Sequence, residues 1–272
     1  MDPRLFPQAS EMADASMVRT LATQAEAIWP QERPILERHG LSGSLRVLDA
    51  GCGTGEITGR LAALWPEAEV LGVDLLEGHL GLARERHARL APRVRFERRS
   101  IFDLGLPARH FDVVACRHVL QSIPHPERAL AELVRVTRAG GLLHLIVEDY
   151  GMIHVQRGRR DPDSFWGAVP GRFAAADGID MHVGRNALSI LHALGLRDLR
   201  IDYVVVDTLR VPRETFAAIW EAWRDGYAET AARNLGTTAQ DVRDQFDDQI
   251  ATIRDPDRYA VWQVPVLSAV VP

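Results

Sequence analysis

Residues Leu45–Thr58 read Leu-Arg-Val-Leu-Asp-Ala-Gly-Cys-Gly-Thr-Gly-Glu-Ile-Thr. A short apolar run ends at Asp49, three glycines follow at alternate positions, and an amphipathic segment starts at Glu56. A buried strand, a tight glycine turn and a helix N-terminus, in this order, predict the first strand–helix unit of a nucleotide-binding α/β sheet. A glycine turn that binds nothing is the simpler alternative. Because each glycine costs up to about 1 kcal/mol in conformational entropy, three at alternate positions favour a turn that contacts a ligand.

The residues around this turn argue against a phosphate ligand. The third glycine of the dinucleotide pattern Gly-x-Gly-x-x-Gly is replaced by Glu56, and the chain has no lysine with which to complete a phosphate-binding loop. Asp49 and Glu56 place carboxylates on both sides of the turn, where they would repel a pyrophosphate. The turn therefore predicts a cationic nucleoside ligand. S-adenosylmethionine, with its ammonium, sulfonium and adenosine groups, fits this description, and a NAD-dependent oxidoreductase is a remote alternative.

The segment Val-Leu-Asp-Ala-Gly-Cys-Gly-Thr-Gly at residues 47–55 resembles motif I of the class I S-adenosylmethionine-dependent methyltransferases. Within that class the motif spacing is similar to the ubiquinone/menaquinone-biosynthesis type and its secondary-metabolite relatives. The resemblance covers residues 45–150 closely and the remainder only as architecture. It implies an α/β fold, with a Rossmann-like sheet of seven mostly parallel strands, the last one antiparallel, and helices on both faces. It also implies S-adenosyl-L-methionine as cofactor and O-, N- or C-methylation in secondary metabolism or cofactor biosynthesis. Two apolar-rich insertions later in the chain favour a small, largely apolar acceptor.

Several residues match the cofactor site that this resemblance implies. Asp74 ends the second predicted strand, where a carboxylate can accept both ribose hydroxyls; the alternative is a cap for the next helix. Phe102 and Asp103 match the family's adenine site; the alternative for Asp103 is a place in a loop turn. Arg117 follows the fourth strand and is expected to bind the methionine carboxylate with two hydrogen bonds. The predicted cofactor site comprises Asp49, Gly51, Cys52, Gly53, Gly55, Asp74, Leu75, Phe102, Asp103 and Arg117.

The chain is predicted to be a single methyltransferase domain with additions. Residues 1–43 form an N-terminal helical cap, in which Trp29-Pro30 separates two helices, and residues 44–150 form the cofactor-binding core. Residues 151–184 are a lid insertion without clean periodicity. Residues 185–272 are the C-terminal half, with a helical insertion at 212–255 whose aromatic residues recur at helical spacing.

Methyl transfer from a sulfonium is an in-line displacement, so the protein mainly has to align the reacting atoms. A base is needed only when the nucleophile arrives protonated. The candidate catalytic residues are Glu148, His118, Tyr150 and His154. The candidate substrate-binding residues are Gln24, Trp29, Tyr150, Trp166 and Trp220, and Gln31 is expected to face the same space. No histidine or cysteine cluster has metal-ligand spacing, so the prediction is an enzyme without a metal.

Composition narrows the possible partners. The net charge of −5 argues against a nucleic-acid partner, and the two cysteines suggest no disulfide framework. No run approaches 18 apolar residues, which predicts no membrane span, and a cytoplasmic enzyme, monomeric or homodimeric, is the default. A non-catalytic regulator or scaffold that keeps only the cofactor pocket is the alternative from another class.

Overall fold

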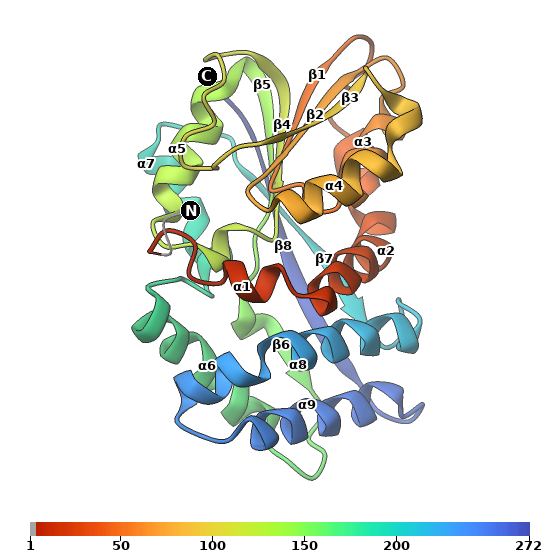
Figure 1. Ribbon diagram of the computed structural model, residues 1–272, viewed down its shortest axis with the longest axis vertical. Coiled ribbons are helices and arrows are strands. Elements are labelled where there is room, and N and C mark those ends of the chain that lie inside the picture. Colours follow the sequence, from red (N-terminus) through yellow and green to blue (C-terminus); the bar gives the residue numbers. More distant parts are fainter. Residues whose placement is uncertain (1–3) are drawn as a thin grey trace.

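A computed structural model of the protein describes residues 4–272. Its centre is an eight-stranded sheet in the order β3-β2-β1-β4-β5-β8, with β7 on the other edge of β8 (Figure 1). β8 pairs antiparallel with β5 and β7, and the short β6 pairs with the start of β8. The predicted mixed sheet with an antiparallel last strand is confirmed, with β6 as an additional strand. The strands are β1 (Arg46–Ala50), β2 (Glu69–Asp74), β3 (Val94–Arg98), β4 (Phe111–Arg117), β5 (Thr137–Ile146), β6 (Ile153–Val155), β7 (Arg200–Asp207) and β8 (Ala260–Val270).

Helices cover both faces of the sheet because each strand presents apolar side chains to both sides. One face packs against α2 (Ala15–Glu37), α3 (Glu56–Leu64) and α4 (Glu77–Arg86). The other face packs against α5 (Pro126–Val136) and α7 (Val183–Ala193). A third apolar core lies at one end of the molecule, where α6 (Pro162–Asp177), α8 (Arg213–Leu235) and α9 (Ala239–Arg254) pack on β6, β7 and β8 (Figure 1).

The predicted break at Trp29-Pro30 is wrong: α2 is one helix of 23 residues with Pro30 and Pro34 inside it. Proline removes a backbone hydrogen bond and normally interrupts a helix. Here residues on both sides of the prolines, including Ile28 and Leu36, are completely buried. Tertiary packing therefore outweighs the local penalty, which a sequence pattern does not show.

Gln31, on α2, contacts the edge strand β7 instead of the predicted substrate. Its amide nitrogen donates to the Val205 carbonyl at 2.9 Å, and its amide oxygen accepts from the Val205 N–H at 3.0 Å. One side chain thus satisfies the two backbone groups that an edge strand would otherwise leave unpaired. This clamp fixes α2 against the sheet.

The expectation of an irregular segment at 151–184 is also wrong, since it contains β6 and the 16-residue helix α6. Asp161 is the N-cap, with its carboxylate accepting from two backbone N–H groups, and Pro162 occupies the first helical turn. Gly178 follows the helix with φ of 69°. These are recognisable start and stop signals, but Pro170 and two glycines inside the helix hide its periodicity.

The N-terminal segment lies across the carboxyl ends of β1, β2 and β4. Its short helix α1 (Ala9–Met12) runs between the sheet and α8 (Figure 1). Glu11 accepts from the Thr230 hydroxyl at 2.6 Å, and the Tyr227 hydroxyl donates to Gln8 at 3.2 Å. These contacts hold α1 above the site described below. Within residues 4–272, none of the helices has both the length and the apolar character that crossing a membrane requires.

Replacing Gln31 by alanine is expected to lower the free energy of unfolding by about 1–3 kcal/mol, because two half-buried backbone groups of β7 lose their partners. Urea denaturation measures this change. Arg33→Ala on the same helix is the control; it removes only the exposed pair with Glu37, worth about 0.5 kcal/mol or less. Equal losses in the two variants would contradict the clamp.

Candidate active site

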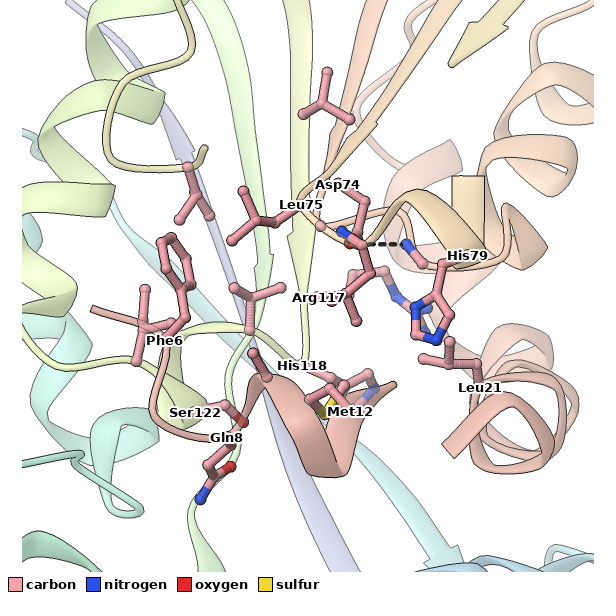
Figure 2. A pocket seen from close by; sticks show the side chains of 18 of the residues that line it. Phe6, Gln8, Met12, Leu21, Asp74, Leu75, His79, Arg117, His118 and Ser122 are labelled. Atoms are coloured by element: carbon pink, nitrogen blue, oxygen red, sulfur yellow. Dashed lines mark hydrogen bonds between the residues drawn. The ribbon is translucent and has the colours of Figure 1, made fainter. Parts of the chain in front are cut away.

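A pocket opens at the carboxyl ends of β1, β2 and β4, where ligands of open α/β sheets bind. Figure 2 shows Asp74 and Leu75 on one side and Phe6, Gln8 and Met12, from the N-terminal segment, on another. The structure therefore brings together residues of the predicted cofactor site, namely Gly51, Gly53, Asp74, Leu75 and Arg117. We refer to this space as the cofactor pocket.

The glycine turn forms the floor of the cofactor pocket. Gly51 and Gly53 line it with φ of 79° and 52°, a conformation that side chains rarely adopt. A Cβ atom at Gly51 would overlap Val119, and one at Gly53 would lie 2.7 Å from Leu21 Cδ1. Gly55 (φ 77°) instead begins α3 and packs closely against His87 and other side chains of the core. Its role is thus to position the helix.

Asp74 connects the glycine turn to the end of β2. Its carboxylate accepts from Gly53 N–H at 2.8 Å and from Leu76 N–H at 2.9 Å (Figure 2). The bond to Leu76 N–H lies just before the start of α4, as the capping alternative expects. The same side chain lines the cofactor pocket, as the ribose-binding prediction expects. Each carboxylate oxygen keeps a lone pair that can accept a hydroxyl from the pocket.

The two carboxylates flanking the turn differ in their environments. Asp49 is buried, and this burial raises its pKa from 3.8 to about 6, despite a 2.6 Å hydrogen bond from the Thr58 hydroxyl. Glu56 pairs with Arg86, so its charge is compensated. Repulsion of phosphate therefore depends on Asp49 far more than on Glu56. Asp49 faces a small side pocket beside the cofactor pocket, which Gln24, Cys52 and Arg117 also line.

Arg117 is buried and already has a partner. A guanidinium nitrogen lies 2.9 Å from the carboxylate of Glu32, on α2, and that carboxylate also contacts His144 at 3.1 Å. Arg117 Nε has no hydrogen-bond partner among the described residues. A bound carboxylate would have to share this cation with Glu32.

His118 and Glu148 form a buried pair. His118 Nδ1 lies 2.7 Å from Glu148 Oε1, and the two side chains are 9 % and 2 % exposed. His118 Nε2 has no partner within residues 4–272, and its backbone φ of 54° is unusual for a residue other than glycine. Such strain often accompanies a functional constraint. We refer to this pair as the His–Glu pair.

A second cavity adjoins the cofactor pocket. Gln8 and Ser122 line both spaces. His118 lines the cofactor pocket, while Tyr150, whose hydroxyl contacts Glu148, lines the second cavity. Burial, and then the Glu148 carboxylate, raise the pKa of Tyr150 well above its ordinary value. The His–Glu pair thus lies in the wall between the two spaces, which we call the aromatic cavity and the cofactor pocket.

Other predicted site residues lie outside these spaces. Ile101, not Phe102, lines the cofactor pocket, since Phe102 packs on Phe6 with ring centroids 5.4 Å apart. Asp103 is exposed and accepts from Gly105 N–H at 3.2 Å, as expected for the loop-turn alternative. Three further predicted site residues lie away from both spaces. Trp29 packs in the core near α3, and His154 is exposed on β6. Trp220 is fully buried behind Trp166 and Trp223.

The structure adds residues that the sequence did not indicate. Gln8 and Met12 come from a segment too short for any periodic signal, and Leu21, His79 and Ser122 reach the pocket from α2, α4 and the segment after β4. Within residues 4–272, no group of three or more His, Cys, Asp or Glu side chains is arranged to hold a metal ion.

The fold and the glycine turn define a Rossmann-like nucleotide-binding domain of the methyltransferase architecture. Residues 47–141 match the family model of the methyltransferase domain. The resemblance of motif I to the class I S-adenosylmethionine-dependent methyltransferases is thereby confirmed over this part of the chain.

Individual relatives match over limited parts of their length. Trans-aconitate 2-methyltransferase of Methylobacterium nodulans is 37% identical over 42% of this chain and 43% of its own. Ubiquinone/menaquinone biosynthesis C-methyltransferase of Ectopseudomonas mendocina is 34% identical over 43% of this chain and 46% of its own. The chain thus matches less than half the length of these relatives. A solved phosphoethanolamine N-methyltransferase of Haemonchus contortus, with S-adenosyl-L-methionine, has the same fold (TM-score 0.57, 21% identity, covering 90% of this chain and 53% of its own).

Replacing Asp49 by asparagine is expected to stabilise the ligand-free protein above pH 6. The folded state raises the pKa of Asp49 from 3.8 to about 6, so ionisation at neutral pH opposes folding by up to about 3 kcal/mol. This penalty develops as the pH rises from 3.8 to about 6, and asparagine removes it while still accepting from Thr58. Urea denaturation at pH 4.5 and pH 8 should show a larger gain at pH 8.

Asp112→Asn serves as a control with the opposite sign. Burial raises the pKa of Asp112, but hydrogen bonds from Arg46 N–H and from Arg138 outweigh it and leave the pKa below its ordinary value. This variant should therefore lose stability at pH 8. A loss at pH 8 for Asp49→Asn as well would contradict the assigned environment of Asp49.

Proposed function

We propose that this protein transfers a methyl group from S-adenosylmethionine to a small, largely apolar molecule held in the aromatic cavity. The observation that carries this proposal is the adjacency of two spaces with shared walls. One space carries the glycine turn and Asp74, and the other is lined mainly by aromatic rings. The His–Glu pair lies between them.

The residues of the cofactor pocket fit S-adenosylmethionine. Asp74 would accept the ribose hydroxyls, Leu75 and Ile101 would contact the adenine, and the glycine turn leaves room for close approach of the ligand. Gln24 and Arg117 line the side pocket and would bind the amino-acid end. When bound, the cofactor supplies a methyl group on a positively charged sulfur.

The aromatic cavity supports an apolar acceptor. An acceptor with several carboxylates, such as the trans-aconitate in the name of one relative, would need basic partners. Within residues 4–272, no arginine or histidine lines this cavity. The aromatic cavity therefore gives no support for trans-aconitate as the acceptor of this protein.

We infer that His118 is the base for acceptors that arrive protonated. Glu148 accepts a hydrogen bond from Nδ1–H at 2.7 Å, which leaves the lone pair on Nε2, the nitrogen without a partner. Glu148 is then a positioning residue, and Tyr150 adjoins it at the cavity wall. Base catalysis of this kind contributes about 10²–10⁴-fold.

Calorimetric titration should show S-adenosylmethionine binding, and Asp74→Ala should weaken it by about 10- to 100-fold, because hydrogen bonds to a charged acceptor are lost. Asp103→Ala is the matched control: its carboxylate is exposed, so affinity should stay unchanged. If Asp103→Ala weakens binding instead, the adenine site predicted from the sequence is correct. Absence of binding by the unaltered protein would sink the proposal.

The His–Glu pair can be tested before the acceptor is known. Nitrogen-15 spectra of the neutral imidazole should show the proton of His118 on Nδ1, and Glu148→Gln should lower the share of this tautomer. With labelled cofactor and a panel of phenols, amines and carbon acids, His118→Gln should lower turnover by about 10²-fold or more, while cofactor affinity changes little. A proton on Nε2 in the unaltered protein would exclude His118 as the base.

A further inference from the structure

The lining of the aromatic cavity is unusually rich in rings. Seven of its thirteen residues are aromatic, contributed by the segment after β5 and by α6, α8 and α9. Tyr150 and Trp166 stack with centroids 5.8 Å apart, and Trp223 lies 5.8 Å from Tyr150 and 6.2 Å from Trp166. Electron-rich ring faces attract cations, most strongly where water is excluded.

The position of Trp166 is held from behind. Its indole N–H donates to the Gln249 side-chain oxygen at 2.9 Å, and Trp220 donates to the same oxygen at 3.0 Å. Gln249 is buried on α9. Two donors on one acceptor fix both indoles, so the Trp166 ring has a fixed orientation at the cavity wall.

The charged groups around this cavity are mostly acidic. Glu148 contacts Tyr150, and Glu11 and Asp177 lie close enough to Tyr227 that they, after burial, raise its pKa. The nearby Arg233, 67 % exposed, is 3.9 Å from Glu11 and offsets it in part. An anion entering this cavity would lose its hydration without gaining a basic partner, which is costly.

On this basis we propose that the aromatic cavity selects acceptors that carry an amine on an apolar body, and that the methyl group is transferred to that nitrogen. This inference rests on the proposed methyltransferase function and names its substrate class. Phenols are a poorer match, because the phenolate needed for attack would be an anion among ring faces and carboxylates.

The proposed methyl transfer to nitrogen needs only the cofactor and residues of this chain. An ammonium whose head group reaches the cofactor pocket, which His118 lines, gives its proton to His118 Nε2, and this leaves a neutral amine. The nitrogen lone pair forms a bond to the methyl carbon, the carbon–sulfur bond breaks, and its electron pair stays on sulfur. The positive charge thus moves from sulfur to nitrogen, where the rings of Trp166 and Trp223, which line the cavity, stabilise it.

Three probes of the same shape test the charge preference: benzyltrimethylammonium, neopentylbenzene and benzylsulfonate. They share a benzyl group and a tetrahedral head, and they differ in being cationic, neutral and anionic. Tryptophan fluorescence should report binding, since Trp166 and Trp223 line the cavity. We expect the cation to bind about 10-fold more tightly than the neutral probe, and the anion to bind most weakly. Tightest binding of the neutral or the anionic probe would overturn the inference.

Trp223→Leu should reduce the preference for the cation over the neutral probe to about 2-fold or less, because the variant keeps apolar volume but removes a ring face. Phe216→Leu is the control, since Phe216 packs in the same aromatic cluster without lining the cavity. If circular dichroism shows that Trp223→Leu is unfolded, Phe246→Leu, which removes another lining ring, takes its place. An unchanged preference in a folded variant would contradict the role of the rings.

Turnover separates this inference from the proposed function. With labelled cofactor, benzyldimethylamine should yield benzyltrimethylammonium in preference to transfer onto p-cresol or phenylacetate. Transfer to p-cresol or phenylacetate but not to the amine would overturn the amine assignment and leave the methyltransferase proposal standing. Failure to bind S-adenosylmethionine would count against the methyltransferase proposal itself.

Discussion

The turn between β1 and α3 has no room for a side chain at Gly51 or Gly53, and the rest of the site depends on that constraint. Gly51 and Gly53 have positive φ, and an added Cβ atom would run into Val119 or Leu21. Asp74 binds Gly53 N–H and so ties the turn to the end of β2. The ends of two neighbouring strands thereby become one rigid edge. Rigid backbone placement is what allows a ligand to be held at contact distance.

Two consecutive residues at the end of β4 carry buried polar contacts to different parts of the chain. Arg117 contacts Glu32 on α2, whereas His118 contacts Glu148 after β5. Removing one member of such a pair leaves a buried charge without a partner, which destabilises a fold strongly. The same contacts that orient the site therefore also fasten α2 to the sheet. Stability and positioning cannot be separated at these residues, whereas Asp49 opposes folding and contributes only to the pocket.

Sequence reasoning succeeded where a signal is local and failed where distant packing decides. The glycine turn, the strand ends and Asp74 were predictable because each depends on residues adjacent in the chain. Pro30 suggested a helix break, yet burial on both sides keeps α2 continuous. Asp103 suits an adenine site by motif position, and in the structure its exposed carboxylate accepts a hydrogen bond within a local turn. Trp220 recurs at helical spacing like its neighbour Trp223, and only packing puts the first behind the cavity and the second on its wall.

The sequence by itself determined the mixed α/β sheet, the glycine turn and the edge at which a nucleoside can bind, because alternation, turn chemistry and strand order are local properties. The tertiary structure alone decided the aromatic cavity. Its seven rings include those of Tyr150, Trp166, Trp223 and Phe246, which lie on four separate elements. The N-terminal segment likewise covers both spaces only because Gln8 and Glu11 contact α8. Distances between elements far apart in the chain follow from packing of the whole core, and no local pattern encodes them.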